Sequence, residues 1–387
     1  MPHDAPLLPS SADAVIIGGG VIGTSAAFHL AEAGVEVVLV ERAGLGSGSS
    51  SRAAGGVRTQ FSDVLNIEIA RRSLAAFRDF GRRPGWEIDL REVGYLFVLD
   101  RAADLAQFER SVALQRERGL DTRLLSVDDT RRLCPLLDGD DLVAGVYSPG
   151  DGHCTPEGAV HGYASGARRH GAHVSTGCEA LAITVRGGQI TEVVTSRGAI
   201  ATNTVVCAAG AWSRRCGALA GVDLPVSPLR RQILFTEAIE GLPEDLPMTI
   251  DFASSFYFHR EGPGLLMGMS DPDETPGFSV ETSDAWLPRL MDVVRRRVPR
   301  IADVGIRGGW AGLYEMTPDH NALLGESAAV ARFLYATGFS GHGFLQAPAV
   351  GEILRDLILD RPPVVDVAPL SAERFDAAAL RPEYNVV

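Results

Sequence analysis

The sequence predicts an α/β protein to which a second region of antiparallel strands is added. Three observations predict this fold class. A strand, a glycine-rich turn, a helix and a second strand follow one another over residues 14–42, and a strand, another glycine-rich turn and a helix follow over 333–359. Between them, residues 229–237 and 256–269 read as strands joined by proline-rich links, which is typical of antiparallel β structure.

The first glycine-rich turn has the spacing of a dinucleotide-binding βαβ unit. It follows the apolar strand 14–17 and reads Gly18-Gly19-Gly20-Val21-Ile22-Gly23. Gly18 permits the tight turn, Gly20 lets a pyrophosphate approach the helix N-terminus, and Gly23 lets the helix pack close to the sheet. The pattern therefore predicts cofactor contacts at Gly18, Gly20, Val21, Ile22 and Gly23.

An acidic residue ends the second strand of this unit. The apolar run 35–40 leads into Glu41 and Arg42, and Glu41 lies eighteen residues after Gly23. At this position a carboxylate is placed to accept hydrogen bonds from a ribose diol, and it repels a 2′-phosphate. The predicted ligand is therefore FAD or NAD, and not NADP.

A segment of small residues follows at 43–56. Taken alone, it reads as a flexible linker. Because it lies directly behind the ribose-binding acid, we interpret it as an ordered loop along the cofactor, in which hydroxyl groups meet phosphate oxygens. The residues expected to contact the cofactor here, together with Arg42, are Ser49, Ser50, Ser51, Arg52, Ala54, Gly55 and Gly56.

The middle of the chain alternates between helices and strands. The pattern predicts helices at 64–80, 101–118 and 287–298, a helix opened by Thr155 and Pro156, and strands at 92–99, 141–147, 173–176, 183–185, 190–195 and 204–208. The strand at 204–208 returns the chain to the cofactor side of the first sheet, where small residues again follow. Further cofactor contacts are therefore predicted at Val174, Ala208, Gly210 and Trp212.

The second glycine-rich turn favours FAD over NAD. It follows the apolar strand 333–336 and places three glycines within six residues, before a helix over about 345–359. The helix N-terminus directs the positive end of its dipole at the bound group, and a reduced flavin carries negative charge that such a helix stabilises. The contacts predicted here are Gly338, Phe339, Gly341, His342, Gly343 and Phe344.

Composition limits the classes of function. The 387-residue chain is 45% hydrophobic and 22% charged with a net charge of −13, which argues against nucleic acid as the main partner. Its five cysteines form no Cys-x-x-Cys pair and its histidines match no ligand spacing, so no metal site is predicted. With no signal peptide and no run of eighteen apolar residues, we expect a cytoplasmic protein without a membrane span. All 36 basic residues are arginines, so chemistry that needs a lysine is excluded.

Together the motifs resemble the D-amino-acid oxidase superfamily, in the branch of glycine oxidase, sarcosine oxidase and the β subunit of proline dehydrogenase. The matching positions span nearly the whole chain: Gly18 to Gly23, Glu41, 49–56, 209–212 and 338–344. The run Gly312-Leu313-Tyr314-Glu315-Met316-Thr317-Pro318-Asp319 resembles proline dehydrogenase β subunits most. The resemblance implies a discontinuous, Rossmann-like FAD-binding domain and a substrate-binding domain built on an antiparallel sheet. We expect the first at 1–88, 140–222 and 305–387, and the second at 89–139 and 223–304.

Departures from the family pattern bear on the chemistry. Monomeric sarcosine oxidases attach the flavin to a cysteine where this chain has Gly312, so the resemblance implies non-covalent FAD. Those oxidases also carry lysines over the flavin and after the second turn, where this chain has the apolar run 265–267 and Leu345. Oxygen reduction would then rely on His342 or an arginine, which favours a dehydrogenase over an oxidase.

The resemblance also implies the reaction. A small amino acid or secondary amine, such as proline, sarcosine or glycine, gives hydride from the carbon beside its nitrogen to flavin N5 and becomes an imine. The protein holds the C–H group in place and fixes the substrate carboxylate. Candidate residues for catalysis and for this clamp are His342, Tyr257, Arg260, Tyr314 and Arg58. The sequence fits equally well with Arg260 as a strand residue that faces water. An alternative interpretation of Tyr257 is that it packs in the core.

Three alternatives stay open at this point. The chain could be an oxygen-using oxidase, the flavin subunit of a multi-subunit dehydrogenase that passes electrons to a protein partner, or a non-enzymatic flavoprotein that uses FAD for structure. The largely intact second glycine-rich turn argues against the last of these. Co-purification of a stoichiometric partner would distinguish the subunit from a stand-alone enzyme.

Overall fold

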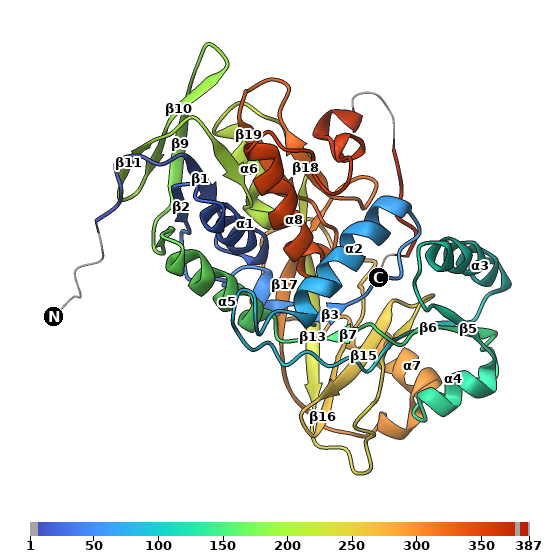
Figure 1. Ribbon diagram of the computed structural model, residues 1–387. Coiled ribbons are helices and arrows are strands. Elements are labelled where there is room, and N and C mark those ends of the chain that lie inside the picture. Colours follow the sequence, from blue (N-terminus) through green and yellow to red (C-terminus); the bar gives the residue numbers. More distant parts are fainter. Residues whose placement is uncertain (1–6, 376–379, 386–387) are drawn as a thin grey trace.

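The computed structural model describes residues 7–375 and 380–385, and two large sheets dominate it (Figure 1). The first sheet has six strands in the order β18-β19-β12-β1-β2-β8, all parallel to their neighbours except β18. The strands are β1 (Ala14–Ile17), β2 (Val37–Val40), β8 (His173–Ser175), β12 (Val205–Cys207), β18 (Leu323–Glu326) and β19 (Phe333–Thr337). Both β1 and β2 are buried along their whole length, as expected for parallel strands covered on two faces.

Helices cover one face of this sheet. They are α1 (Val21–Glu32), α2 (Val64–Arg78), α5 (Pro156–Arg169) and α8 (Gly343–Ile358). Helix α1 lies between α5 and α8 (Figure 1), which explains why nearly all of its residues are buried. The crossing with α8 is close because a Cβ at Gly351 would overlap the hydroxyl of Ser25. The other face of the sheet packs in a second core with residues of β9 (Ala180–Arg186) and β10 (Gln189–Thr195).

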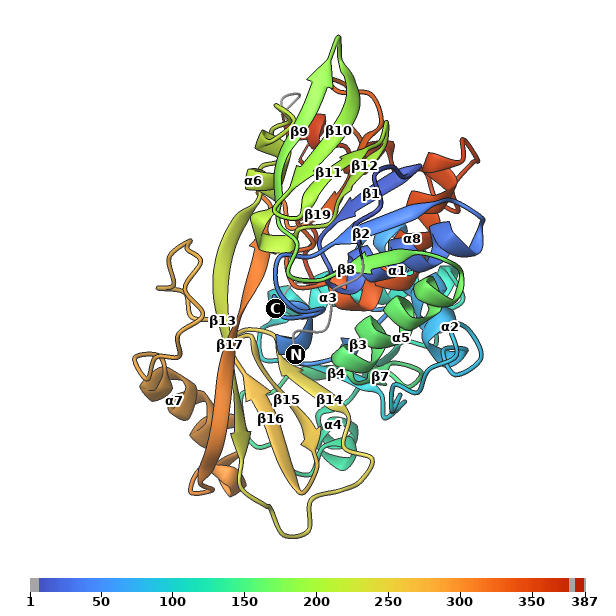
Figure 2. The ribbon, with the colours of Figure 1, turned by 90° about the vertical axis from the view of Figure 1, so that its left-hand side faces the viewer.

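The second large sheet has eight strands in the order β17-β13-β16-β15-β14-β4-β6-β5. All neighbours are antiparallel except β4 and β14. The strands are β4 (Tyr95–Leu99), β5 (Arg123–Leu125), β6 (Ala144–Ser148), β13 (Ser227–Thr236), β14 (Met248–Asp251), β15 (Phe256–Glu261), β16 (Gly264–Gly268) and β17 (Ile306–Met316). In Figure 2 the long strands β13 and β17 run side by side from the lower part of the molecule towards the first sheet.

Smaller elements complete the fold. They are β3 (Gly56–Val57), β7 (Gly152–His153), β11 (Gly198–Ala201), α3 (Ala102–Glu117), α4 (Val127–Leu133), α6 (Ser213–Ala218), α7 (Leu287–Arg297) and 3₁₀ turns at Ser50–Arg52, Gly210–Trp212, Pro299–Ile301, Ala368–Leu370 and Ala372–Phe375. Strands β9, β10 and β11 form a separate three-stranded sheet, whose β9–β10 hairpin projects at the top of Figure 1.

The predicted fold class is confirmed, and most predicted elements exist with shifted ends. The expected strand 92–99 begins only at Tyr95, because Gly94 has a φ of +87° and a Cβ there would overlap the Tyr147 ring. Strands β6 and β17 fall in ranges that we assigned to the FAD-binding domain, yet they pair in the eight-stranded sheet. The domain boundaries remain a prediction, and residues 1–6, 376–379 and 386–387 of the predicted ranges lie outside the described residues.

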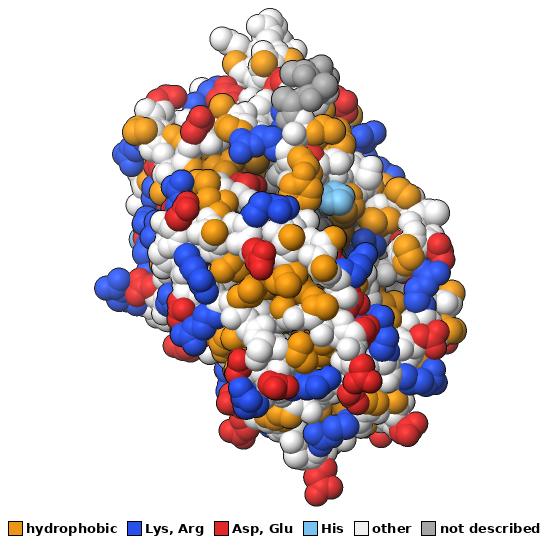
Figure 3. All heavy atoms as spheres, turned by 90° about the vertical axis from the view of Figure 1, so that its right-hand side faces the viewer, with side chains coloured by type: hydrophobic (Ala, Val, Ile, Leu, Met, Phe, Trp, Pro, Cys, Tyr) orange, Lys and Arg blue, Asp and Glu red, His pale blue; other side chains and the backbone are white. Residues whose placement is uncertain are grey.

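The surface mixes charges of both signs. Figure 3 shows arginine and acidic side chains interspersed with apolar ones over the face that it presents. Among the described residues, no helix has the length and apolar character needed to cross a lipid bilayer. The same part of the chain contains no group of three or more histidine, cysteine, aspartate and glutamate side chains arranged to hold a metal ion.

Candidate active site

A cavity of about 860 Å³ is lined by the carboxyl ends of the parallel strands and by the eight-stranded sheet. The first sheet contributes the turns that follow β1, β2 and β12, and the second contributes residues of β4, β13, β14, β15 and β17. The N-terminus of α8 also reaches the wall. Ligands of α/β proteins bind at this edge of a parallel sheet, so the fold itself directs a cofactor to the cavity.

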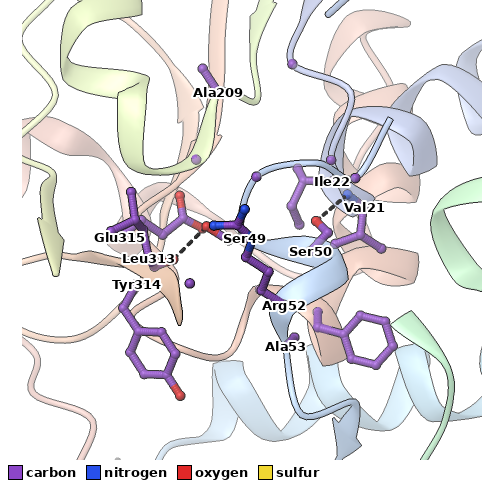
Figure 4. Close-up of a pocket in the computed structure, with 18 of the residues that line it drawn as sticks. Val21, Ile22, Ser49, Ser50, Arg52, Ala53, Ala209, Leu313, Tyr314 and Glu315 are labelled. Carbon is purple, nitrogen blue, oxygen red and sulfur yellow. Dashed lines mark hydrogen bonds between the residues drawn. The ribbon is translucent and has the colours of Figure 1, made fainter. Parts of the chain in front are cut away.

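The first glycine-rich turn lies at the wall, as the spacing predicts. Gly18 has a φ of +118°, and a Cβ there would overlap the carbonyl of Ala208 on the neighbouring strand. A Cβ at Gly23 would overlap the carbonyl of Gly18, so the first turn of α1 lies directly on the glycine loop. The N-cap residue Gly20 makes no side-chain bond, and Val21 N donates to Ser50 Oγ at 3.0 Å (Figure 4). Ser50 thus satisfies one N–H of the first turn, and the N–H groups of Ile22 and Gly23 in the same turn suit an anion.

Glu41 lines the cavity at the end of β2. Its carboxylate accepts hydrogen bonds from Gly19 N at 2.7 Å and Ala43 N at 2.8 Å, which fixes it beside the glycine loop. The guanidinium of Arg42 lies 4.1 Å from the centroid of the Trp212 ring, a cation–π contact on the same wall. The predicted ribose contact of Glu41 remains a prediction.

The loop 49–56 is ordered, as interpreted from its position. Ser49 Oγ donates to Leu313 O at 2.6 Å (Figure 4). Arg52 Nη1 donates to Ala311 O at 3.0 Å, so β17 holds the loop. The Trp310 indole N–H donates in return to Arg52 O at 3.1 Å. This segment therefore joins the first sheet to the second and forms part of the cavity wall.

The second glycine-rich turn brings the N-terminus of α8 to the cavity. Gly338 and Gly341 have φ values of +69° and +98°, and a Cβ at Gly341 would lie 2.6 Å from the Tyr314 ring. His342 is the N-cap of α8 and makes no side-chain cap bond. The cavity is therefore lined by the open N-termini of two long helices, a donor set that suits the pyrophosphate and the electron-rich edge of a flavin.

Arg58 and His342 form a buried pair at the wall. Arg58 Nη2 donates to His342 Nε2 at 3.0 Å and to Asn385 O at 2.5 Å, while Nη1 donates to Gln60 O. Burial and the neighbouring Arg58 charge lower the pKa of His342 well below its usual range. His342 is therefore a neutral acceptor, and Arg58 carries the positive charge of the pair.

Three further candidates for catalysis remain. Tyr257 and Tyr314 line the cavity, whereas Arg260 does not. Arg260 Nε donates to Gly262 O at 3.1 Å and Nη1 to Leu242 O at 3.0 Å, both outside the cavity wall. The reason is strand geometry, because Tyr257 and Arg260 are three residues apart on β15 and so point to opposite faces. Arg260 thus lies off the cavity wall, and its predicted role in catalysis or in the carboxylate clamp remains a prediction.

Five cofactor candidates also do not line the cavity: Gly23, Ser51, Val174, Gly338 and Phe339. A Cβ at Gly23 would overlap the Gly18 carbonyl and one at Gly338 the Thr317 side chain, so both glycines allow close packing at the turns. Phe339 is a core residue. Val174 lies on the edge strand β8, where it pairs with Leu39 of β2. Their predicted contacts with the cofactor remain predictions.

The sequence interpretation did not single out Arg231, which the structure places at the cavity. It lines the cavity, and its guanidinium lies 5.3 Å from the centroid of the Tyr314 ring. Nη1 donates to Arg230 O at 3.1 Å, whereas the buried Nε has no hydrogen-bond partner among the described residues. The alternation of β13 was the available signal, because Arg231 and the apolar Ile233 share one face and both line the cavity.

The remaining wall of this half is aromatic and apolar. Tyr95, Met248 and Ile250 line it together with Tyr257 and Tyr314. Burial raises the pKa of all three tyrosines, so they are neutral hydroxyl donors at ordinary pH. Glu315, which points away from Tyr314 in Figure 4, accepts from Thr337 Oγ1 at 2.8 Å, and burial raises its pKa.

Comparison with known proteins identifies the class. Residues 13–357 match the family described as FAD dependent oxidoreductase (DAO), and the chain belongs to this family. The cavity fits the implied cofactor, because a dinucleotide cradle of glycine turns and two open helix N-termini lies at one wall. FAD dependence and the predicted relationship to the D-amino-acid oxidase superfamily are thus confirmed.

Two solved structures share the fold at high similarity. The L-proline dehydrogenase from P. horikoshii superposes with a TM-score of 0.91 at 30% identity, over 97% of this chain and 100% of that one. The glycine oxidase from Geobacillus kaustophilus superposes with a TM-score of 0.84 at 27% identity, over 94% of this chain and 99% of that one.

Curated relatives include two mitochondrial enzymes of Mus musculus. Dimethylglycine dehydrogenase is 29% identical over 395 residues, which is 97% of this chain and 45% of the relative. Sarcosine dehydrogenase is 31% identical over 386 residues, which is 95% of this chain and 42% of the relative. The chain thus spans less than half the length of these relatives.

Proposed function

We propose that the chain oxidises the C–N bond of a small amino acid or secondary amine that bears a carboxylate, of the sarcosine, proline or glycine type. The observation that carries the proposal is Arg231, whose Nε is buried without a hydrogen-bond partner among the described residues, on the cavity wall beside Tyr314. A buried guanidinium with free donors is matched by a carboxylate. The names of the relatives, which act on dimethylglycine, sarcosine, proline and glycine, support the same substrate class.

In this mechanism the protein binds and orients the substrate. Arg231 holds the carboxylate, the neutral tyrosine hydroxyls donate to it or to the amine, and the apolar wall of Met248 and Ile250 removes water. Removal of water favours the uncharged amine, which is the form that can give up hydride. When bound, FAD supplies the hydride acceptor, and the residues named in the two glycine turns hold it.

We propose a dehydrogenase in preference to an oxidase. The chain contains no lysine, and His342 is neutral. Arg58, which donates to His342, is therefore the positive group at the N-terminus of α8. Its two Nη atoms already donate to Gln60 O, Asn385 O and His342. Activation of oxygen needs pre-organised positive charge that is free to meet a developing anion.

The test is the flavin spectrum of the purified protein under anaerobic conditions, with sarcosine, proline, glycine, dimethylglycine and D-amino acids added singly, followed by air. Bleaching by one amine and slow return of colour in air are expected. Rapid return would show an oxidase, and no bleaching by any of these amines would contradict the proposed substrate class. Precipitation of the protein is expected to release all FAD into solution, since the cofactor is proposed to be non-covalent.

A protein partner that accepts electrons is a second candidate, favoured by one observation. Ile306 and Trp310, on the edge strand β17, are 43% and 37% exposed. The Trp310 indole N–H donates a hydrogen bond to Arg52 O, in the loop that lines the cavity. Co-purification of a stoichiometric partner with the native protein is the test, and loss of that partner in Trp310→Glu is expected.

The five free cysteines are consistent with a reducing, cytoplasmic setting, which stays a proposal.

A further inference from the structure

A segment that follows a strand of the eight-stranded sheet reaches the part of the cavity lined by the turns of the six-stranded sheet. Residues 271–283 lie within the connection between β16 and α7, and two of them, Phe278 and Val280, line the cavity. The Phe278 ring stacks on Trp212, with ring centroids 5.5 Å apart and an interplanar angle of 27°. Trp212 lies in the turn after β12, so this contact joins the two sheets at the cavity wall.

Two arginines surround the stacked pair. The Arg42 guanidinium lies 4.1 Å from the Trp212 ring centroid, and that of Arg215 lies 4.1 Å from the Phe278 ring centroid. Both arginines line the cavity, and neither forms an ion pair with a carboxylate among the described residues. Positive charge that no carboxylate of the described residues neutralises, next to Glu41 and the N-terminus of α1, suits the phosphate-bearing half of a dinucleotide.

Strand β13 holds the segment in place. It pairs with β16 only over Ile233–Phe235, so the edge of residues 227–232 on that side has no strand partner among the described residues. The segment occupies this edge through Gly277 N, which donates to Pro228 O at 2.9 Å, and Ser283 N, which donates to Gln232 Oε1 at 2.8 Å.

Arg230 makes the strongest attachment. Its Nε donates to Glu274 Oε2 at 2.7 Å and its Nη1 to Glu281 O at 2.6 Å, so one side chain holds both ends of the part that carries Phe278. Both Arg230 and Glu274 are mostly shielded from solvent, with 21% and 12% of their side chains exposed, which favours a persistent ion pair. Arg230 itself does not line the cavity.

We propose that residues 271–283 form a cover over the phosphate-bearing half of the FAD site, with Phe278 as an additional cofactor-retaining residue and Arg230–Glu274 as its fastening. The cover controls how fast FAD leaves. The cover extends from the eight-stranded sheet, and it lies over a site whose other wall is formed by the glycine turns of the six-stranded sheet. The inference rests on FAD binding and not on the proposed amine substrate.

The experiment measures the rate of FAD release from the purified holoprotein, by the rise of free-flavin fluorescence after dilution, with no amine present. Phe278→Ala is expected to speed release by at least about fivefold, the factor for loss of an aromatic pair and a cation–π contact. Arg230→Ala and Glu274→Gln are expected to speed release severalfold with the Phe278 ring intact. Thr282→Ala is the matched control, since it shortens an exposed side chain of the same segment that does not line the cavity, and a change below about twofold is expected.

A second readout follows the segment itself. Because Glu274 and Glu281 lie within it, a glutamate-specific protease is expected to cut there faster in the apoprotein than in the holoprotein, as peptide mapping would show. Release rates within twofold of the wild-type rate in Phe278→Ala and in Glu274→Gln overturn the proposal, as does equal cleavage with and without FAD. Failure of amine oxidation leaves these readouts unaffected, so the two proposals fail separately.

Discussion

The two halves of the cavity are built in different ways. Much of the cofactor half comes from three short segments, within 18–22, 46–56 and 341–345, whose backbone groups and small side chains face the cavity. The substrate half consists of single side chains that arrive from separate strands: Tyr95, Arg231, Met248, Ile250, Tyr257 and Tyr314. Backbone recognition requires glycine at fixed spacing and is visible in one sequence, whereas a pocket of single side chains leaves no local pattern.

The largest effect is expected in the cofactor half, from Gly23→Ala. The added Cβ would overlap the carbonyl of Gly18, and neither backbone can move without displacing β1 or α1. Overpacking of this kind costs about 1–3 kcal/mol or more. We expect the flavin content of the purified protein to fall at least about tenfold, with a lower melting temperature. Gly44→Ala, where a Cβ meets nothing within 4 Å, is the control, and full flavin content in Gly23→Ala would contradict the assigned turn.

The next effect tests the acid of the same half. In Glu41→Arg the acceptor of the Gly19 and Ala43 N–H groups is lost, and a positive charge replaces it at the predicted ribose site. We expect a protein that purifies colourless, whereas Glu41→Gln retains part of the FAD. Flavin absorbance per protein is the measurement. A yellow Glu41→Arg protein with unchanged flavin content would show that the assignment of Glu41 is wrong.

The substrate half is tested by two arginines that sequence alone cannot rank. Arg231→Met is expected to lower kcat/KM for a carboxylate-bearing amine by about 100-fold or more, with FAD content unchanged, because a charged pair in a desolvated site is lost. Arg260→Met, which changes a residue off the cavity wall, is expected to remain within about twofold of the wild type. Equal losses in the two variants would remove Arg231 from the clamp.

A smaller effect is expected on the pH dependence of stability, from the buried carboxyl group of Asp151 near Arg58. Asp151 accepts hydrogen bonds from Thr59 N and Thr59 Oγ1, each at 2.9 Å, and burial raises its pKa from 3.8 to about 6. The folded state therefore binds this proton more tightly than the unfolded state. The stabilisation is complete below pH 4 and is lost as the pH rises through about 6.

In Asp151→Asn this dependence is absent. Between pH 4 and 7 the free energy of unfolding of the wild type is expected to fall relative to that of Asp151→Asn, by up to about 3 kcal/mol for a shift of this size. Urea unfolding of both proteins at the two pH values measures the difference. A difference that stays constant over this range would show that Asp151 does not titrate there.

Much of the fold could be predicted from the sequence, for local reasons. Apolar periodicity and capping residues place α2, α3 and α7 close to their predicted ranges, because each buries one face and begins or ends at residues that do not continue a helix. Strand partners could not be predicted in the same way. The assignment of 140–222 to one domain gave no sign that β6 pairs with β4 and β5, since such pairing depends on hydrogen bonds between distant segments.

The sequence by itself determined the cofactor and its cradle. The glycine spacing, the acid at Glu41 and the second turn before α8 are properties of contiguous segments, and the structure places these motifs at one cavity. The tertiary structure alone decided which single side chains face that cavity. It selected Arg231 over Arg260 and brought Phe278 to Trp212, because the face that a strand residue presents and the path of a loop are set by partners far away in the chain.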